Sequence, residues 1–201
     1  MNSQFIDQLG WKLGANELPY EIPMHPILVH LTLGLFIIAI LFDIAGALFR
    51  IERPIFKFLG LIAIRSGFFD VGWYNLLGAA VVTFFTVAFG FFELLLANPL
   101  IDKNSAWGLS ASWTMLLHGL GGVLLLGVIV AMTVWRGLQR YNWRKEASRQ
   151  VQWSYLLLGL VMLGILYVHG TLGAQLGEEF GIHVTAAKLI QEGVNPNLLA
   201  K

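Results

Sequence analysis

The sequence has no cysteine, and charged residues make up only 12% of its 201 positions. Without cysteine the chain cannot form a disulfide, an iron–sulfur cluster, a thiolate metal site or the covalent attachment of a c-type haem. A bound cofactor would therefore depend on histidine, methionine, tyrosine or carboxylate side chains. The lysines and arginines form no run of the kind that binds nucleic acid, so we expect no nucleic-acid partner. The first residues also lack a basic segment followed by an apolar core, and we expect no cleaved signal peptide.

Apolar residues are abundant instead: they make up 57% of the chain, and the mean hydropathy is +0.70. Apolar runs of about 20 residues can cross the ~30 Å hydrocarbon core of a bilayer as helices. We expect an all-α fold, an integral membrane four-helix bundle with short amphipathic interfacial helices, in a single membrane domain of residues 1–201. Interfacial helices are predicted at residues 3–13 and 51–70, and the tail from Glu178 onwards is polar enough to leave the membrane. The predicted spans are residues 26–49, 73–96, 113–135 and 153–172.

Basic residues indicate how the spans are oriented. Nine of the 13 lysines and arginines lie in the connections between the first and second spans and between the third and fourth. The positive-inside rule places such connections on the cytoplasmic side, so both chain termini would lie on the lumenal or periplasmic side. Tryptophan is enriched at membrane–water interfaces, and five tryptophans near the expected ends of the spans agree with this orientation: Trp73, Trp107, Trp113, Trp135 and Trp153.

Three histidines lie inside predicted spans, each on a different helix: His30, His118 and His169. At ~1.5 Å per residue, all three lie roughly 6–7 Å below the outer edge of the hydrocarbon layer. An ionisable side chain in hydrocarbon is costly, tends to face the inside of a bundle and suggests a functional site. Because three separate helices place an imidazole at one depth, we expect these side chains to converge.

Each of these histidines is followed four residues later by a glycine, at Gly34, Gly122 and Gly173. Residues four apart share a helix face, so bare backbone lies one turn from each imidazole. A flat macrocycle needs such room, and two neutral imidazoles from two helices are the usual axial ligands of a b-type haem. Small residues at this spacing also let membrane helices pack closely without any cofactor. Taken together, the pattern favours a haem b whose iron is bound by two of His30, His118 and His169.

Other polar side chains have less specific expectations. His25 lies about 140° around a helix from His30 and so on another face. It is an interfacial residue without a special role, a further ligand that would allow a second haem, or a contact to a quinone head group. His183, in the polar tail, is expected to be solvated. Glu93 is expected to reach water beyond the second span, with proton acceptance and ligand contact left open, and Asp43 is expected to form a structural ion pair.

The segment from Met24 to Gly34, MHPILVHLTLG, together with Asp43, resembles the signature His-Pro-x-x-Val-His-Phe-Pro-x-Gly/Ala. This signature opens a bacterial family of four-helix membrane proteins of unknown function, and the resemblance covers nearly the whole chain. Thr32 stands where the family usually has proline, and Phe180 stands at the late histidine of many members. The chain looks most like cyanobacterial members, which tend to be encoded beside subunits of a haem–copper terminal oxidase. The resemblance thus implies an accessory respiratory subunit in the thylakoid or plasma membrane.

These features together suggest a membrane b-type cytochrome that relays electrons from quinol, at the outer interface, to a respiratory terminal oxidase. The expected partners are haem–copper oxidase subunits, a related membrane complex or a homologous copy. On its own the protein would be a carrier, and any quinol oxidase activity would belong to the complex. The competing hypothesis is a cofactor-free assembly or scaffold subunit whose histidines hydrogen-bond between helices. A quinone- or metal-binding protein without haem is a third hypothesis. In every case the lipid bilayer surrounds the chain.

Overall fold

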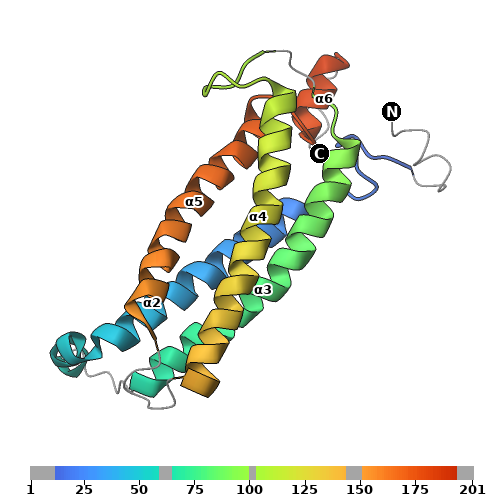
Figure 1. Cartoon of the computed structure of the whole chain (residues 1–201). Helices are drawn as coiled ribbons and strands as arrows, with labels where there is room; N and C mark the ends of the chain where they lie inside the picture. The colour runs from blue at the N-terminus through green and yellow to red at the C-terminus, as the bar shows by residue number, and fades with distance from the viewer. Residues whose placement is uncertain (1–11, 59–64, 100–102, 144–150, 194–201) are drawn as a thin grey trace. The chain divides into compact units, whose positions relative to one another are not determined.

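The computed structural model describes residues 12–58, 65–99, 103–143 and 151–193. Within these residues the regular structure is helical and contains no strand, and a π-helical turn, Gln139–Trp143, continues α4. Four of the helices are long and apolar enough to cross a membrane, so the predicted all-α membrane fold is confirmed. Figure 1 labels the helices, which are α2 (Met24–Phe58), α3 (Arg65–Leu96), α4 (Ala111–Leu138), α5 (Trp153–Glu178) and α6 (Thr185–Gln191).

The ends of the helices follow local sequence signals only in part. α5 begins at Trp153 and α3 ends at Leu96, both as predicted. Pro99 follows the end of α3 closely, and a proline disfavours the helical conformation of the residue before it. α5 continues past the predicted residue 172 to Glu178, and the short helix α6, which was not predicted, lies in the polar tail that follows.

The predicted interfacial helix at residues 51–70 is not a separate element. Its first part is the end of α2, which runs through Pro54 to Phe58, and its last part is the beginning of α3 at Arg65. A proline inside a helix removes one backbone hydrogen bond, but so close to the end of α2 little helix remains to be disrupted. The predicted helix at residues 3–13 falls outside the described residues except for its last two positions, which are not helical.

By their backbone contacts the residues form two compact units, which are described one at a time. Unit 1 comprises residues 1–27, 86–123 and 168–201, and unit 2 comprises residues 28–85 and 124–167. The prediction of a single membrane domain remains a prediction.

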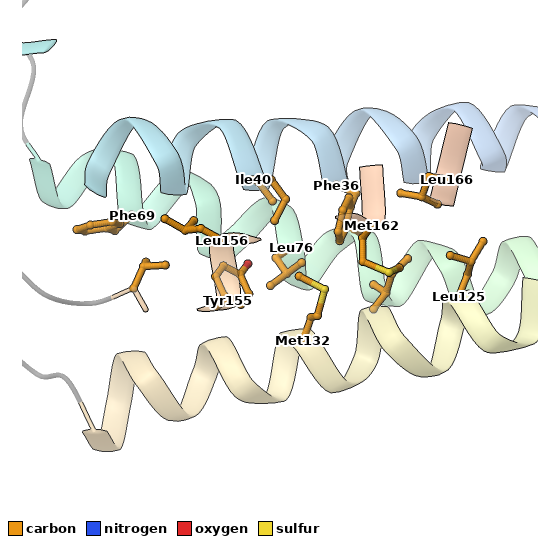
Figure 2. Packing of buried hydrophobic residues seen from close by; sticks show 14 residues of the cluster. Phe36, Ile40, Phe69, Leu76, Leu125, Met132, Tyr155, Leu156, Met162 and Leu166 are labelled. Atoms are coloured by element: carbon orange, nitrogen blue, oxygen red, sulfur yellow. The ribbon is translucent and has the colours of Figure 1, made fainter. Parts of the chain in front are cut away.

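The core of unit 2 is an apolar cluster of buried side chains from α2, α3, α4 and α5. Figure 2 shows Ile40, Leu76 and Met132 pointing toward one another, and all three are buried. A Cβ atom built on Gly159 of α5 would lie only 2.6 Å from Cδ1 of Ile40. The missing side chain at this glycine therefore makes room for the isoleucine and lets helix backbones approach closely.

A buried ion pair joins α2 and α4 inside unit 2. Asp43 and Arg136 are both 0% exposed, with Nε of the arginine 2.9 Å and Nη2 3.0 Å from the two carboxylate oxygens. Nη2 also donates to the carbonyl of Phe69, at 3.3 Å. Gly72 leaves space for the carboxylate, because a Cβ there would lie 2.5 Å from Oδ1. The ion pair predicted for Asp43 is thus present, with Arg136 as its partner.

Candidate functional site

Three imidazoles meet in unit 1, and they come from three helices. His25 lies in the first turn of α2, His118 in α4 and His169 in α5. The Nε2 atoms of His25 and His118 are 3.4 Å apart, and their ring planes are nearly perpendicular at 85°. His118 and His169 are stacked instead, with ring centroids 4.3 Å apart and planes inclined by 8°. The predicted convergence of His118 and His169 is present, and we name these three residues the histidine cluster.

The two nitrogens of the His25–His118 contact point at each other. The ring centroids are 5.7 Å apart, which exceeds the Nε2–Nε2 distance of 3.4 Å by 2.3 Å. That difference is about the width of one imidazole ring, so both nitrogens lie close to the line that joins the centroids. The arrangement is head-on, like two ligands on opposite sides of one metal ion.

Hydrogen bonding to the backbone determines which nitrogen of His25 carries a proton. Its Nδ1 lies 2.9 Å from the carbonyl oxygen of Thr86, which can only accept. Nδ1 is therefore the donor, and in the neutral ring the lone pair of Nε2 faces His118. Nδ1 of His118 is buried and has no hydrogen-bond partner in the described part of the chain. A ring that directs a lone pair away from a backbone-bound Nδ1–H has the usual orientation of a metal-ligating histidine.

Two of the imidazoles pack against glycines, and each of these glycines lies on the facing helix. A Cβ on Gly173 of α5 would lie 2.8 Å from Cε1 of His118, and one on Gly121 of α4 would lie 2.7 Å from Nδ1 of His169. The arrangement between α4 and α5 is therefore reciprocal. The sequence led us to expect room next to the histidine on the same helix, whereas the structure fills that room with the neighbouring helix's ring.

The ring of His25 also packs against a glycine, which lies on α3. A Cβ on Gly90 would lie 2.7 Å from Nδ1 of this ring. The two other glycines predicted to border a cofactor are less crowded. A Cβ on Gly122 would lie at ordinary contact distance, 3.9 Å, from Nε2 of His169, and one on Gly34 would have nothing within 4 Å.

His30, the first of the predicted ligands, belongs to unit 2, and its side chain is exposed. The sequence argument correctly placed His25 and His30 on different faces of one helix. It chose His30 because this residue lies deeper in the span. The observation that points to His25 is the position of α3, whose Thr86 carbonyl binds the ring, and that position is not encoded in the local spacing.

Glu93 of α3 holds the beginning of α2 in place. Its Oε1 atom accepts hydrogen bonds from the hydroxyl of Tyr20 at 2.9 Å, from the backbone N–H of Met24 at 2.8 Å and from that of His25 at 3.0 Å. Free N–H groups at a helix start attract a carboxylate both by hydrogen bonding and through the helix dipole. The expectation that Glu93 reaches water was wrong, because this side chain is only 5% exposed.

The same carboxylate changes the chemistry of Tyr20. Burial raises the pKa of the Tyr20 hydroxyl well above its ordinary value, and the hydrogen bond to Glu93 and the negative charge of Glu93 raise it further. The tyrosine thus stays a hydrogen-bond donor over the whole physiological pH range.

His183 was expected to be solvated, and this was also wrong. The side chain is half-buried, with Nδ1 3.0 Å from the carbonyl oxygen of Asn16 and Nε2 2.9 Å from the carbonyl oxygen of Glu93. The chain reverses after α5 through Gly181 and His183, both with positive φ, of 69° and 58°. Gly181 was the one local signal for a turn here, but nothing in the sequence indicated which segments the turn would meet.

Among the described residues, no metal site with several protein ligands is formed. The described residues contain no group of three or more histidines, cysteines or carboxylates arranged to hold a metal ion. The histidine cluster offers two facing nitrogens, so a metal ion there would need most of its ligands from another molecule.

Comparisons with known proteins give one match. No curated protein and no solved structure matches the chain. A family model described as "Predicted membrane protein (DUF2231)" matches residues 21–186, which include the helices α2 to α5 and the first two residues of α6. This match confirms the resemblance to a membrane protein family of unknown function. The chain belongs to the DUF2231 family of predicted membrane proteins.

Proposed function

We propose that the protein is a membrane b-type cytochrome in which His25 and His118 would hold one haem. The proposal depends on one observation, the head-on approach of the two Nε2 atoms, 3.4 Å apart. Two imidazoles from different helices are a common way to hold a haem in a helical bundle. The proposed pair keeps His118 from the sequence prediction and replaces His30 by His25.

The residues of the histidine cluster fit this role in two respects. The Thr86 carbonyl fixes His25 in the tautomer whose Nε2 can bind iron. Imidazole nitrogens on opposite sides of a metal are about 4 Å apart, given metal–nitrogen bonds of about 2 Å. The two rings would thus have to separate by about half an ångström. The helices α4 and α5 would also have to part around the porphyrin, because His118 and His169 fill the space over Gly173 and Gly121.

The chain's own residues have distinct tasks in this proposal. His25 and His118 would hold the haem through its iron, and as neutral imidazoles they would add no charge to it. Glu93 anchors the turn that carries His25, and Gly90 lets α3 approach that ring. A bound haem b would supply one-electron oxidation and reduction. The ring of His169 stacks against the ring of His118 and so restricts the rotation of the His118 side chain.

The electron donor and acceptor are proposed from the family resemblance alone. Quinol at the outer interface would be the donor, and haem–copper terminal oxidase subunits in a thylakoid or plasma membrane would be the acceptor. The charge distribution supports this arrangement, because it predicts that the end of the protein with the histidine cluster faces the lumen or periplasm.

A second candidate function is that of a cofactor-free scaffold subunit. The observation in its favour is that the histidines themselves occupy the space over Gly121 and Gly173. In that case the His25–His118 contact is a hydrogen bond between two neutral rings that joins α2 and α4. At 3.4 Å this bond would be longer than the usual 2.7–3.2 Å of protein hydrogen bonds, which makes it a weak tie.

A visible absorption spectrum of the purified protein separates the two candidates. The cytochrome requires a Soret band and, after reduction, an α-band, whereas the scaffold requires a colourless protein. His25→Ala and His118→Ala should each abolish or strongly change the bands. His30→Ala is the matched comparison: if it removes the bands while His25→Ala retains them, the ligand pair is wrong although the cytochrome stands.

A further inference from the structure

Three fully buried side chains of unit 2 carry a polar atom that has no hydrogen-bond partner in the described part of the chain. These atoms are Nη1 of Arg136, Nε2 of Gln139 and the hydroxyl oxygen of Tyr155, and all three residues are 0% exposed. Buried polar groups are almost always hydrogen-bonded, because a group that leaves water without gaining a partner destabilises the folded state. Each of these atoms therefore needs a partner that the described side chains do not supply.

The three side chains lie close together, although they come from different parts of the chain. Gln139 begins the π-helical turn that continues α4 and follows Arg136 by three residues, so the two lie about one turn apart. Oε1 of Gln139 accepts the backbone N–H of Gln152 at 2.7 Å, and Tyr155 lies one helical turn beyond Gln152. The Tyr155 side chain also interacts electrostatically with Asp43 and Arg136. The unpaired atoms thus border one region between α4 and the beginning of α5, beside the ion pair.

The bonds that these side chains already make determine which groups remain free. Because Oε1 of Gln139 accepts an N–H, the orientation of this amide is fixed, and Nε2 offers its two N–H groups. Arg136 uses Nε and Nη2 on Asp43, which leaves the two N–H groups of Nη1. The hydroxyl of Tyr155 can donate one hydrogen bond and can also accept one. Since most of the free groups are donors, their shared partner must be able to accept.

Charge and size restrict this partner further. Arg136 and Asp43 neutralise each other, so an added anion would be an uncompensated charge in a membrane-spanning region, which is costly. The side chains of the ion pair, of Gln139 and of Tyr155 are all 0% exposed, so the site is enclosed and admits only a small molecule. A buried water molecule is small and neutral, and it typically makes about three hydrogen bonds to polar groups that lack other partners.

We propose that Arg136, Gln139 and Tyr155 together bind one water molecule, which links α4 to α5 beside the buried ion pair. The water oxygen accepts one N–H from Nη1 and one from Nε2, and one water O–H donates to the hydroxyl oxygen of Tyr155. The tyrosine's own O–H is then free to point toward the carboxylate of Asp43. Each of the three unpaired atoms thereby gains a partner. This proposal is independent of haem binding, because these residues belong to unit 2 and the histidine cluster belongs to unit 1.

A structure of the whole protein that resolves ordered water tests the site directly. We expect one water oxygen within about 2.7–3.2 Å of Nη1 of Arg136, Nε2 of Gln139 and the hydroxyl oxygen of Tyr155. A side chain of the same protein in this position would overturn the proposal, and so would the lack of any density there. A halide ion would refute it as well, and crystals grown in bromide would reveal one by anomalous scattering.

Thermal unfolding of Tyr155→Phe tests the bond from water to the tyrosine by its sign. This substitution removes only the hydroxyl oxygen. If that oxygen had no partner, its removal would relieve an unpaired buried group and raise the melting temperature. With the water bound, the removal breaks the network, and we expect the melting temperature to fall by about 2–4 °C. Tyr74→Phe is the matched control, because Tyr74 of α3 is 63% exposed and its hydroxyl should contribute little. An unchanged or raised melting temperature for Tyr155→Phe would contradict the proposal.

A double variant separates the shared water from a direct bond between Tyr155 and Asp43. Gln139→Met removes the amide and keeps the length of the side chain. The described structure has no hydrogen bond between Gln139 and the Tyr155 hydroxyl, so without a shared partner the two losses should add. If both bind one water molecule, the double variant should lose less than the sum of the two single losses. Additive losses would refute the shared site, and if a variant does not fold, the structure of the unaltered protein still decides.

Discussion

At the scale of single residues, the packing of imidazole rings against glycines leads to a prediction about glycine substitutions. Gly121→Ala and Gly173→Ala would each place a Cβ within 2.8 Å of a histidine ring, so the ring or the helix must move. Overpacking of this kind costs about 1–3 kcal/mol. We expect both variants to lower the unfolding temperature in detergent, and to change the spectrum of any haem bound at His118.

Glycines on the same two helices provide matched controls. A Cβ on Gly127 of α4 or on Gly164 of α5 would have nothing within 4 Å. Alanine is a better helix former than glycine by about 1 kcal/mol, so these substitutions should be neutral or stabilising. If all four variants have the same unfolding temperature, the packing of the imidazoles against glycine does not contribute to stability.

Tyr20 reports on the charge of Glu93. The Glu93 carboxylate contributes to the raised pKa of the tyrosine both through the hydrogen bond and through its negative charge. Glu93→Gln removes the charge, so the pKa of Tyr20 should move back toward its ordinary value. The measurement is an ultraviolet titration at alkaline pH, with Tyr20→Phe to identify the contribution of this tyrosine among the five. An unchanged titration would mean that burial alone accounts for the effect.

The sequence predicted the meeting of His118 and His169, left the role of His25 open, and gave the wrong surroundings for Glu93 and His183. The depth of a residue along a span can be counted from the sequence, and this depth was sufficient to predict that His118 and His169 lie at one level. The environment of His25, Glu93 and His183 depends on how the N-terminal segment and the tail fold back over the ends of the helices. Their hydrogen bonds connect positions 61 to 167 residues apart, and the spacing of residues along the chain does not predict such contacts.

At the scale of helices, the ion pair between α2 and α4 should be strongly asymmetric in its response to mutation. Arg136→Met would leave the carboxylate of Asp43 buried at 0% exposure without its partner. Removing one member of a buried pair typically costs about 3–5 kcal/mol. We expect a markedly lower unfolding temperature for Arg136→Met, and a similar loss for Asp43→Leu.

The double variant is the decisive comparison. Replacing both charges by apolar residues of similar size is often neutral or stabilising, because no ion remains to be desolvated. Asp43→Leu combined with Arg136→Met should therefore recover most of the loss. Additive losses in the double variant would show that the two side chains stabilise the protein separately and not as a pair.

Sequence patterns located the spans but not all helix ends. Apolar runs and tryptophans located the starts of α4 and α5 within a few residues, since these features reflect the width of the membrane. The long continuation of α2 past residue 49 and the helix α6 were missed. Polar residues inside a helix look like a connection in the sequence, whereas the backbone continues wherever its own hydrogen bonds remain available.

At the scale of the whole molecule, the distribution of basic residues predicts the orientation in the membrane. The connections between the first and second spans and between the third and fourth should face the cytoplasm. Single introduced cysteines test this cleanly, because the natural chain has none that could react. Lys57 and Lys103 are suitable sites, since both are exposed and lie outside the spans on opposite sides of the predicted topology.

The expected result is side-specific labelling in intact cells or sealed vesicles. A membrane-impermeant maleimide added from outside should modify Lys103→Cys and spare Lys57→Cys until the membrane is permeabilised. The reverse pattern would invert the topology and place the histidine cluster on the cytoplasmic side, so quinol oxidation at the lumenal face would no longer be tenable.

The reciprocal seats of His118 and His169 also determine how α4 and α5 can move. Each of these helices contributes a ring and the glycine that receives the other's ring. If either helix rotates about its long axis, its own imidazole ring must leave the glycine of the other helix. Its backbone must also collide with the ring of the other helix. The rotations of the two helices are therefore coupled at this point, and a reorientation of His118 must displace the backbone of α5 at Gly173.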